Sequence, residues 1–216
     1  MLRPLFLTAA ILHILAPWAL ALDPFQESGG HVVMEAENYD AKIPRIGKEW
    51  TFFSSAGSAA SGTGYLRVLP NTAVTTDTGY TTLSPELKYQ INFTTAGTYY
   101  VWIRGRGPTT NDNTLHGGID GSGPASADKI GIFPSSWSWR RSTMDGPVAM
   151  IVVGSPGVHS FHLWMREDGF IVDKILLTTS SSYIPSGMGP PESPRVDTTP
   201  PDFEVTYPAE GSTIGQ

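Results

Sequence analysis

Hydrophobic and polar residues of this chain alternate over short runs, which is the pattern of β-strands with one buried face. Leu87 to Phe93 alternate in this way, a turn follows at 94–97, and the alternation resumes over 99–103. Other runs of strand length predict further strands over 65–69, 114–119, 137–142, 148–153, 159–165 and 171–178. The 3.6-residue periodicity of helices is almost absent, so the pattern predicts an all-β domain.

Turn-forming residues separate these runs. The chain contains 23 Gly and 18 Pro residues, which are spread between the predicted strands. Several short strands joined by turns are typical of two antiparallel sheets packed face to face. We therefore expect a two-sheet antiparallel β-sandwich.

The first residues have the layout of a cleavable secretory signal. A positive charge at Arg3 precedes an apolar stretch, and small residues lie at Ala19 and Ala21. A membrane anchor is the alternative, but Pro17 and the shortness of the apolar stretch favour removal. We expect a signal peptide over 1–21 and a secreted, extracellular chain.

Charge and cysteine content narrow the possible partners. The chain has 14 Lys and Arg residues against 20 Asp and Glu residues, a net charge of −6, or about −7 without the segment that holds Arg3. Nucleic acids and anionic membranes bind clustered positive charge, so this balance argues against both as partners. Cysteine is absent, but a domain of this size buries enough apolar surface to be stable without disulfides.

Two predicted strands, near the start and the end of the domain, carry acidic residues inside apolar runs. Glu35 and Glu37 lie in VVMEAENY at 32–39, and Asp173 lies in FIVDKILLT at 170–178. Charged groups are seldom buried without a partner, so these carboxylates need one. A metal ion between the first and last strands is the most economical partner.

The tail of the chain differs in composition from the rest. Residues 180–201 are rich in Ser, Pro and Gly, which favours an extended linker over a folded unit. Apolar and polar residues alternate again within 202–216, and together with the preceding DTTPP this stretch resembles the opening of a bacterial immunoglobulin-like repeat. We expect a β-sandwich over 22–179, a linker, and the truncated start of another domain of a longer modular protein.

Five motifs occur in a characteristic order along the domain. They are EAENY at 35–39, AGTYYVWIRGRG at 96–107, Trp-x-Trp at 137–139, VGSPGVHSFHL at 153–163 and FIVDKIL at 170–176. In this order, residues 31–178 resemble the galactose-binding-like jelly-roll modules typified by family 6 carbohydrate-binding modules. The resemblance implies a β-sandwich that binds sugars without catalysis, carries a structural calcium ion and is attached to glycan-degrading enzymes.

The resemblance also implies where calcium and sugar bind. The calcium ligands of the family fall among Glu35, Glu37 and Asp173; because calcium takes six to eight oxygen ligands, backbone carbonyls or other side chains must complete the set. Alternatively, one Glu of the pair points to solvent. For the sugar, Trp137 matches the position of a stacking aromatic residue in the family.

Aromatic rings and polar side chains together are what a sugar site needs. Sugars present flat C–H faces that stack on rings, and hydroxyls that require fixed polar partners. Trp137 and Trp139 are two residues apart and lie on one face of a strand, and Tyr65 and Tyr80 are candidates for an opposing ring. The alternative is that either Trp belongs to the core of the sandwich.

One residue departs from the family pattern. Ile171 occupies the position where the family commonly has a ligand-binding asparagine, two residues before the metal-binding aspartate. Isoleucine makes no hydrogen bond, so either binding is lost or another polar group replaces the asparagine. The nearest polar cluster in sequence is 166–168, and Asp168 is our candidate from it.

These observations favour a noncatalytic polysaccharide-binding module of a larger secreted, glycan-degrading protein. The constrained acids are better explained as metal ligands than as a glycosidase pair, and no G-x-S-x-G, phosphate-loop or zinc motif is present. We expect any catalytic activity in a downstream domain of the same polypeptide. The alternative is a structural spacer or adhesion module with the same fold and no affinity for glycans.

Overall fold

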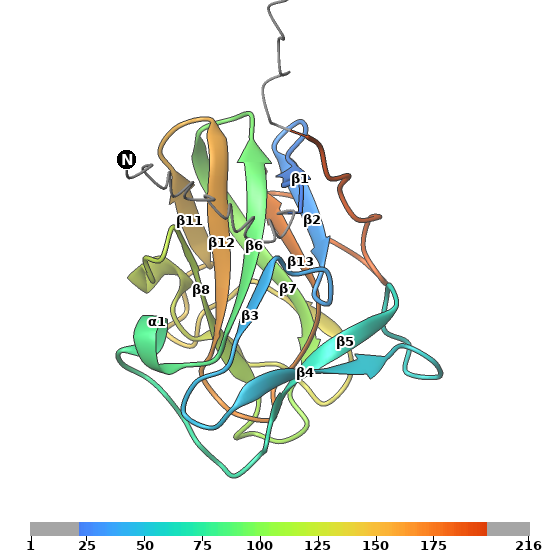
Figure 1. The fold of residues 1–216 in the computed structure, drawn as a ribbon, viewed down its shortest axis with the longest axis vertical. Helices are drawn as coiled ribbons and strands as arrows, with labels where there is room; N and C mark the ends of the chain where they lie inside the picture. Colours follow the sequence, from blue (N-terminus) through green and yellow to red (C-terminus); the bar gives the residue numbers. More distant parts are fainter. Residues whose placement is uncertain (1–21, 198–216) are drawn as a thin grey trace, which may run out of the picture.

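The computed structural model describes residues 22–197 (Figure 1). Its strands are β1 (Phe25–Gln26), β2 (His31–Glu35), β3 (Ala41–Ile43), β4 (Glu49–Ser54), β5 (Gly64–Leu69), β6 (Glu86–Phe93), β7 (Gly97–Arg106), β8 (Thr114–Ile119), β9 (Ile130–Gly131), β10 (Ser138–Arg140), β11 (Met150–Val153), β12 (Gly157–Met165) and β13 (Ile171–Thr178). One helical turn, α1 (Tyr80–Leu83), and one 3₁₀ turn (Ala125–Ala127) accompany them. The expected signal peptide and the expected immunoglobulin-like start lie outside the described residues.

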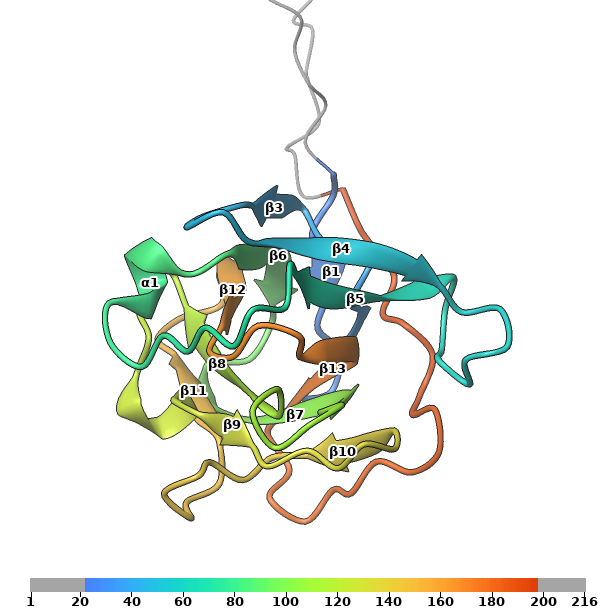
Figure 2. The same cartoon turned by 90° about the horizontal axis from the view of Figure 1, so that it is seen from below.

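The strands form two sheets that pack face to face (Figures 1 and 2). One sheet has the order β1-β6-β12-β8-β9, with β3 also on β6; the other has the order β10-β7-β13-β5-β4, with β11 on β7 and β2 on β13. Every pairing is antiparallel except that of β1 with β6. The predicted two-sheet antiparallel β-sandwich is therefore confirmed.

Alternation along each strand separates a buried core from an outer face. In β5, Leu66 and Val68 are buried between the sheets, whereas Tyr65 and Arg67 are half-buried on the outer face. Full burial of an aliphatic side chain contributes about 1.5–3 kcal/mol, so the repeated inward residues dominate the stability of the fold. The outer face of the second sheet is thereby left to polar and aromatic residues.

The predicted strands all overlap observed ones, with differences at some ends, such as β11, which begins at Met150 and not at 148. The strands over 114–119 and 171–178 have the expected bounds, but β10 is shorter than expected, and Trp137 lies just before it. Strands β1, β3, β4 and β9 were not predicted. The first, second and last of these have only two or three residues, and the adjacent Phe52 and Phe53 interrupt the alternation in β4.

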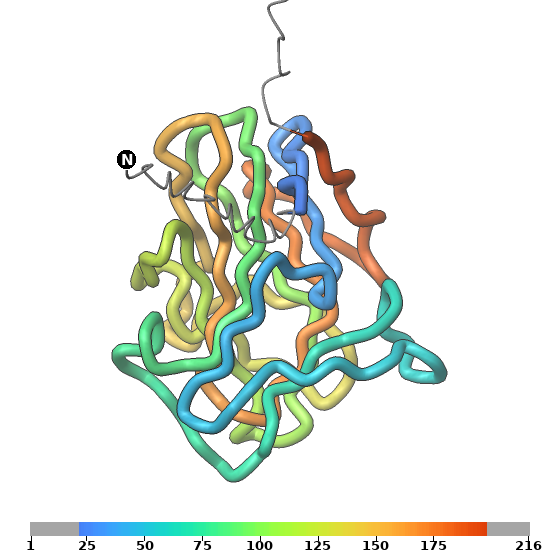
Figure 3. The backbone as a smooth tube through the Cα atoms, in the orientation of Figure 1, coloured from blue at the N-terminus to red at the C-terminus, as the bar shows by residue number. Residues whose placement is uncertain are grey.

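We call residues 180–197 the C-terminal strap. The strap is extended and contacts the sandwich. The strap runs beside β1 and β2 (Figure 3), where Ser193 exchanges hydrogen bonds with the backbone of Val33 at 2.9 and 3.0 Å. The guanidinium of Arg195 lies 3.8 Å from the centre of the Phe25 ring. The expected spacer is thus attached to the domain over its described part. No helix among the described residues is long and apolar enough to cross a membrane.

Candidate functional site

A groove of about 610 Å³ lies on the outer face of the sheet that contains β7. Trp102 and Arg104 of β7, Trp137, and Trp139 of β10 line one side, and residues 184–188 of the C-terminal strap line the other. Trp139 is the cross-strand partner of Arg104, which places both on this face. The groove is thus built by two strands and a segment distant in sequence.

Hydrogen bonds of the ring nitrogens fix both predicted tryptophans. Trp137 Nε1 donates to the carbonyl oxygen of Ser58 at 2.6 Å, and Trp139 Nε1 donates to that of Gly187 at 3.2 Å. Both rings are half-buried, and Trp139 packs against the buried cluster of Val33, Trp102 and Leu176 on this face. Apart from these N–H groups the rings are apolar, which is the surface that sugar C–H groups require. The guanidinium carbons of Arg104 and Arg106 lie 5.2 and 5.0 Å from the centre of the Trp137 ring, so cations border this ring.

Tyr65 contacts Trp137 but is not among the residues that line the groove. Its ring centre is 5.5 Å from that of Trp137 in an edge-on contact, and Phe53 stacks on it at 5.5 Å. Tyr80 does not join this group. It is buried against His116, with ring centres 3.8 Å apart, and its hydroxyl donates to Gly123 O at 3.1 Å.

Asp168 does not reach the groove either. It is fully buried, forms an ion pair with Lys48, and accepts hydrogen bonds from the backbone N–H groups of Thr72 and Val74 at 2.8 and 2.9 Å. Burial alone raises the pKa of Asp168, but the hydrogen bonds from Lys48 and the backbone outweigh it and hold the pKa below its ordinary value. This carboxylate therefore stabilises the loop after β5 and is not available to a ligand.

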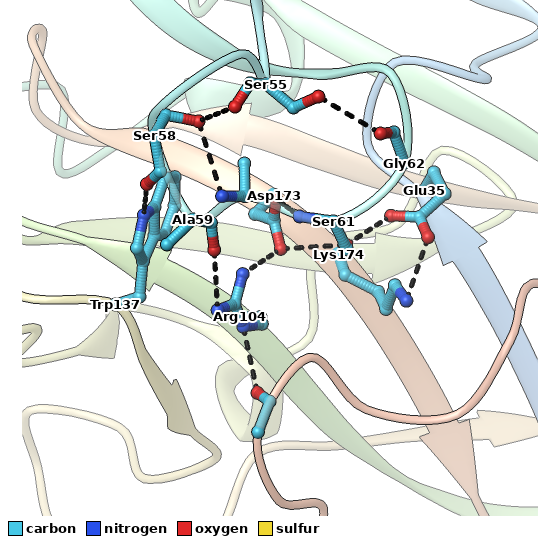
Figure 4. Close-up of polar contacts among 12 residues, drawn as sticks. Glu35, Ser55, Ser58, Ala59, Ser61, Gly62, Arg104, Trp137, Asp173 and Lys174 are labelled. Atoms are coloured by element: carbon cyan, nitrogen blue, oxygen red, sulfur yellow. Dashed lines mark hydrogen bonds and ion pairs between the residues drawn. The ribbon is translucent and has the colours of Figure 1, made fainter.

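Glu35 and Asp173 lie together, but each has a cation of its own (Figure 4). Arg104 Nη1 is 2.5 Å from Asp173 Oδ2, and Lys174 Nζ is 2.8 Å from Glu35 Oε1. Ser61 Oγ joins the two acids, donating to Glu35 Oε2 at 2.6 Å and lying 3.0 Å from Asp173 Oδ2. Burial raises the pKa of Glu35, against the opposing effects of Lys174 and Ser61.

Glu37 is held separately from this pair. Its Oε1 accepts hydrogen bonds from the backbone N–H groups of Thr63 and Gly64 at 2.7 and 2.9 Å. Its Oε2 is buried and is the one oxygen among the three carboxylates that has no partner in the described part of the chain.

These three acids do not fit a calcium ion. Calcium takes six to eight oxygen ligands, whereas the set offers one unengaged carboxylate oxygen, and Arg104 and Lys174 already balance two of the charges. Within residues 22–197, no group of three or more acidic or histidine side chains is placed to hold a metal ion. Arg104 and Lys174 are thus the partners of Asp173 and Glu35, and one oxygen of Glu37 has no partner in the described part of the chain.

Arg104 connects this buried cluster to the groove. Its Nη2 donates to Ala59 O at 3.1 Å and its Nε donates to Gly187 O at 3.1 Å, in addition to the pair with Asp173 (Figure 4). One side chain thereby ties β7 to β13, to the loop before β5 and to the C-terminal strap. Sequence reasoning missed Arg104, although its alternation with Trp102 in WIRGRG places both on one face.

Ile171 is almost fully buried, with 2% of its surface exposed. Its cross-strand partners are Arg67 of β5 and Arg106 of β7. The position that carries the family's asparagine thus has no polar group of its own, but an arginine stands on each neighbouring strand.

Several solved structures have a similar arrangement of strands. The family 35 carbohydrate-binding module of Abf62 from Cellvibrio japonicus is 11% identical with a TM-score of 0.48, covering 70% of this chain and 94% of that one. A family 35 module from Clostridium thermocellum is 11% identical with a TM-score of 0.47, covering 69% and 98%. A family 36 module in complex with calcium and xylotriose is 12% identical with a TM-score of 0.43, covering 68% and 99%. Similarities this low carry no argument about this chain.

Sequence comparison is more informative. Uncharacterized protein P23 of Formosa agariphila is 31% identical over 197 residues, a match that covers 77% of this chain and 48% of that protein. The chain therefore spans about half the length of this relative. A model of the glycosyl hydrolase family 115 C-terminal domain matches residues 24–192, which include the whole sandwich and most of the strap. On this match, the chain belongs to the family of glycosyl hydrolase family 115 C-terminal domains.

Proposed function

We propose that this domain binds polysaccharide chains without catalysis, in the groove between Trp137, Trp139 and the C-terminal strap. The observation that carries the proposal is the presence of two half-buried indole rings in one groove, each with its N–H already engaged. Such rings offer flat apolar faces next to a polar rim, which is the combination that sugar rings bind.

The composition of the groove supports a binding role over a catalytic one. Most glycosidases cleave their substrate with a pair of carboxylic acids. The groove is lined by no Asp or Glu residue, and Asp173 and Glu35 are buried in ion pairs beneath it. We therefore assign the proposed binding to this domain and any hydrolysis to other domains of the protein.

Family membership supports the wider setting of the proposal. The family is named as a C-terminal domain of glycosyl hydrolases. Together with the signal-like residues 1–21, this supports a secreted module of a larger glycan-degrading protein. We leave calcium out of the proposed mechanism, because Arg104 and Lys174 supply the charges that the ion was expected to supply.

A structural spacer without glycan affinity is the second candidate. The observation that favours it is Ile171, which is buried and apolar where a polar ligand-binding residue was expected. Binding measurements separate the two candidates. We expect the purified protein to be retarded in affinity gels that contain polysaccharide, and the retardation to be lost in Trp137→Ala. A folded wild-type protein that binds none of a broad panel of plant, algal and microbial polysaccharides supports the spacer.

A further inference from the structure

Cations without an acidic partner are concentrated on one sheet of the sandwich. In the region 22–197, eight Lys and Arg residues form ion pairs with acidic residues. The remaining ones are Arg67, Lys88, Arg106, Arg140 and Arg141. Lys88 alone lies on the sheet that contains β6; the four arginines lie on β5, on β7, and on or directly after β10 of the other sheet.

Two of these arginines pack against the aromatic rings of the candidate site. The guanidinium carbon of Arg106 is 5.0 Å from the ring centre of Trp137 and 6.0 Å from that of Tyr65. That of Arg141 is 4.8 Å from the ring centre of Trp102. Positive charge therefore accompanies the aromatic rings along the groove and its margin.

The two acids beneath the groove do not offset that charge. Asp173 and Glu35 are buried and already paired with Arg104 and Lys174. The chain as a whole has a net charge of −6, so the cationic face is not a consequence of a generally basic composition. A local excess of positive charge on an acidic protein attracts anions to that face.

The hydrogen-bonding groups of the site point to the same ligand chemistry. Arg106 Nε and Trp102 Nε1 are buried N–H donors that have no acceptor among the described residues. A buried donor without an acceptor is energetically unfavourable, so a ligand oxygen next to it is favoured. The guanidinium fork of arginine matches carboxylate and sulfate-like oxygens in geometry as well as in charge.

We propose that the groove selects anionic polysaccharides, whose carboxylate or sulfate groups pair with Arg106 and Arg141 while their sugar rings stack on Trp137 and Trp139. This inference rests on the proposed glycan-binding function and adds the charge of the ligand to it. Arg67, which flanks Ile171 opposite Arg106, extends the cationic row towards β5. Arg67 and Arg141 also donate to the carbonyl oxygens of Gly169 and Ser181 at 3.2 and 2.8 Å, but a neutral chain would leave the charges of these arginines without an acidic partner.

Affinity electrophoresis and calorimetry with three kinds of polysaccharide test the inference. The first is a polyuronate such as polygalacturonate, the second a sulfated galactan such as carrageenan, and the third a neutral glucan or xylan. We expect the full chain to bind at least one of the two anionic polymers more tightly than any neutral one, with an affinity that falls as salt is raised. Which anionic polymer binds more tightly distinguishes carboxylate from sulfate.

Matched variants assign the effect to named residues. Arg106→Gln and Arg141→Gln should each weaken binding of the anionic polymer about tenfold and reduce its salt dependence. Lys88→Gln removes an equally unpaired cation from the opposite sheet and should leave binding unchanged. Because Arg106 packs on Trp137, Arg106→Lys is added: it keeps the charge but loses the planar fork, and should retain part of the affinity. Circular dichroism confirms that each variant is folded.

The outcomes separate the two proposals. Equal binding of neutral and anionic polymers, unaffected by Arg106→Gln and Arg141→Gln, overturns the charge selectivity and leaves the glycan-binding function standing. An equal loss in Lys88→Gln shows nonspecific attraction of polyanions and also overturns it. If the protein binds none of the polymers, the glycan-binding function itself is overturned.

Discussion

Arg104 and Asp173 form a nearly completely buried ion pair, with Nη1 and Oδ2 2.5 Å apart, directly beneath the groove. The same arginine donates to Ala59 O and Gly187 O, so it orders both the loop before β5 and the wall formed by the C-terminal strap. The shape of the groove therefore depends on a charge pair that the ligand does not need to touch.

Removing one partner of this pair should destabilise the fold strongly. Asp173→Ala leaves the Arg104 guanidinium buried without its counter-charge, and we expect a loss of about 3–5 kcal/mol in the free energy of unfolding. Glu49→Gln, which breaks the exposed pair with Lys42, is the control and should cost at most about 1 kcal/mol. Chemical denaturation measures both; similar losses in the two variants would contradict the role assigned to the buried pair.

Chelation of divalent cations should leave stability unchanged. Arg104 and Lys174 balance Asp173 and Glu35, so the fold does not require an ion at this place. We expect the same melting temperature in excess EDTA, in buffer and in millimolar calcium. An ion bound only by the native state would raise the melting temperature by mass action, so a reversible increase with calcium would restore the calcium site predicted from the sequence.

Trp137 should contribute to binding more than to folding. Since stacking of an aromatic ring on an apolar face contributes on the order of 1–3 kcal/mol, Trp137→Ala should weaken polysaccharide binding roughly tenfold to a hundredfold. Phe52→Ala changes another exposed aromatic residue, on β4, and serves as the control. If Trp137→Ala unfolds the protein, the main role of the ring is to hold Ser58 and the loop before β5.

Acid should destabilise the fold partly through Asp168. Hydrogen bonds hold the pKa of Asp168 below its ordinary value, so this group stabilises the fold above about pH 4, and its contribution is lost as the pH falls through the lowered pKa. Asp168→Asn should be less stable at neutral pH but lose less stability between about pH 5 and pH 2. Exposed Asp145→Asn is the control, and parallel pH profiles for wild type and Asp168→Asn would refute the assignment.

The C-terminal strap should behave as part of the domain. Arg195 packs on Phe25, forms an ion pair with Asp40 at 2.8 Å and donates to Asn38 O at 2.6 Å. Arg195→Ala should therefore lower the free energy of unfolding by about 1–3 kcal/mol, whereas Arg140→Ala, at an exposed position with no ion pair to another described residue, should have little effect. Thermal and chemical denaturation measure the difference; no loss in Arg195→Ala would show that the strap is only loosely attached.

The sequence by itself determined the sandwich and the shared face of the two tryptophans in the candidate groove. Period-two alternation is a local property, so strands such as β8 and β13 were predictable to the residue. Spacing alone also placed Trp137 and Trp139 on one face, and the groove brings them together. These features need no knowledge of which strands become neighbours.

Only the tertiary structure determined the interaction partner of each charged residue. Asp173 pairs with Arg104, 69 residues away, and Trp139 meets Gly187 of the strap, 48 residues away. Sequence reasoning correctly required a partner for the buried acids. The sequence is, however, equally consistent with a cation from a neighbouring strand and with a bound metal ion. In the folded sheet β7 lies beside β13, and this placement makes Arg104 the partner of Asp173. Long-range pairing of this kind leaves no periodicity in the sequence, which is why it became visible only in the folded chain.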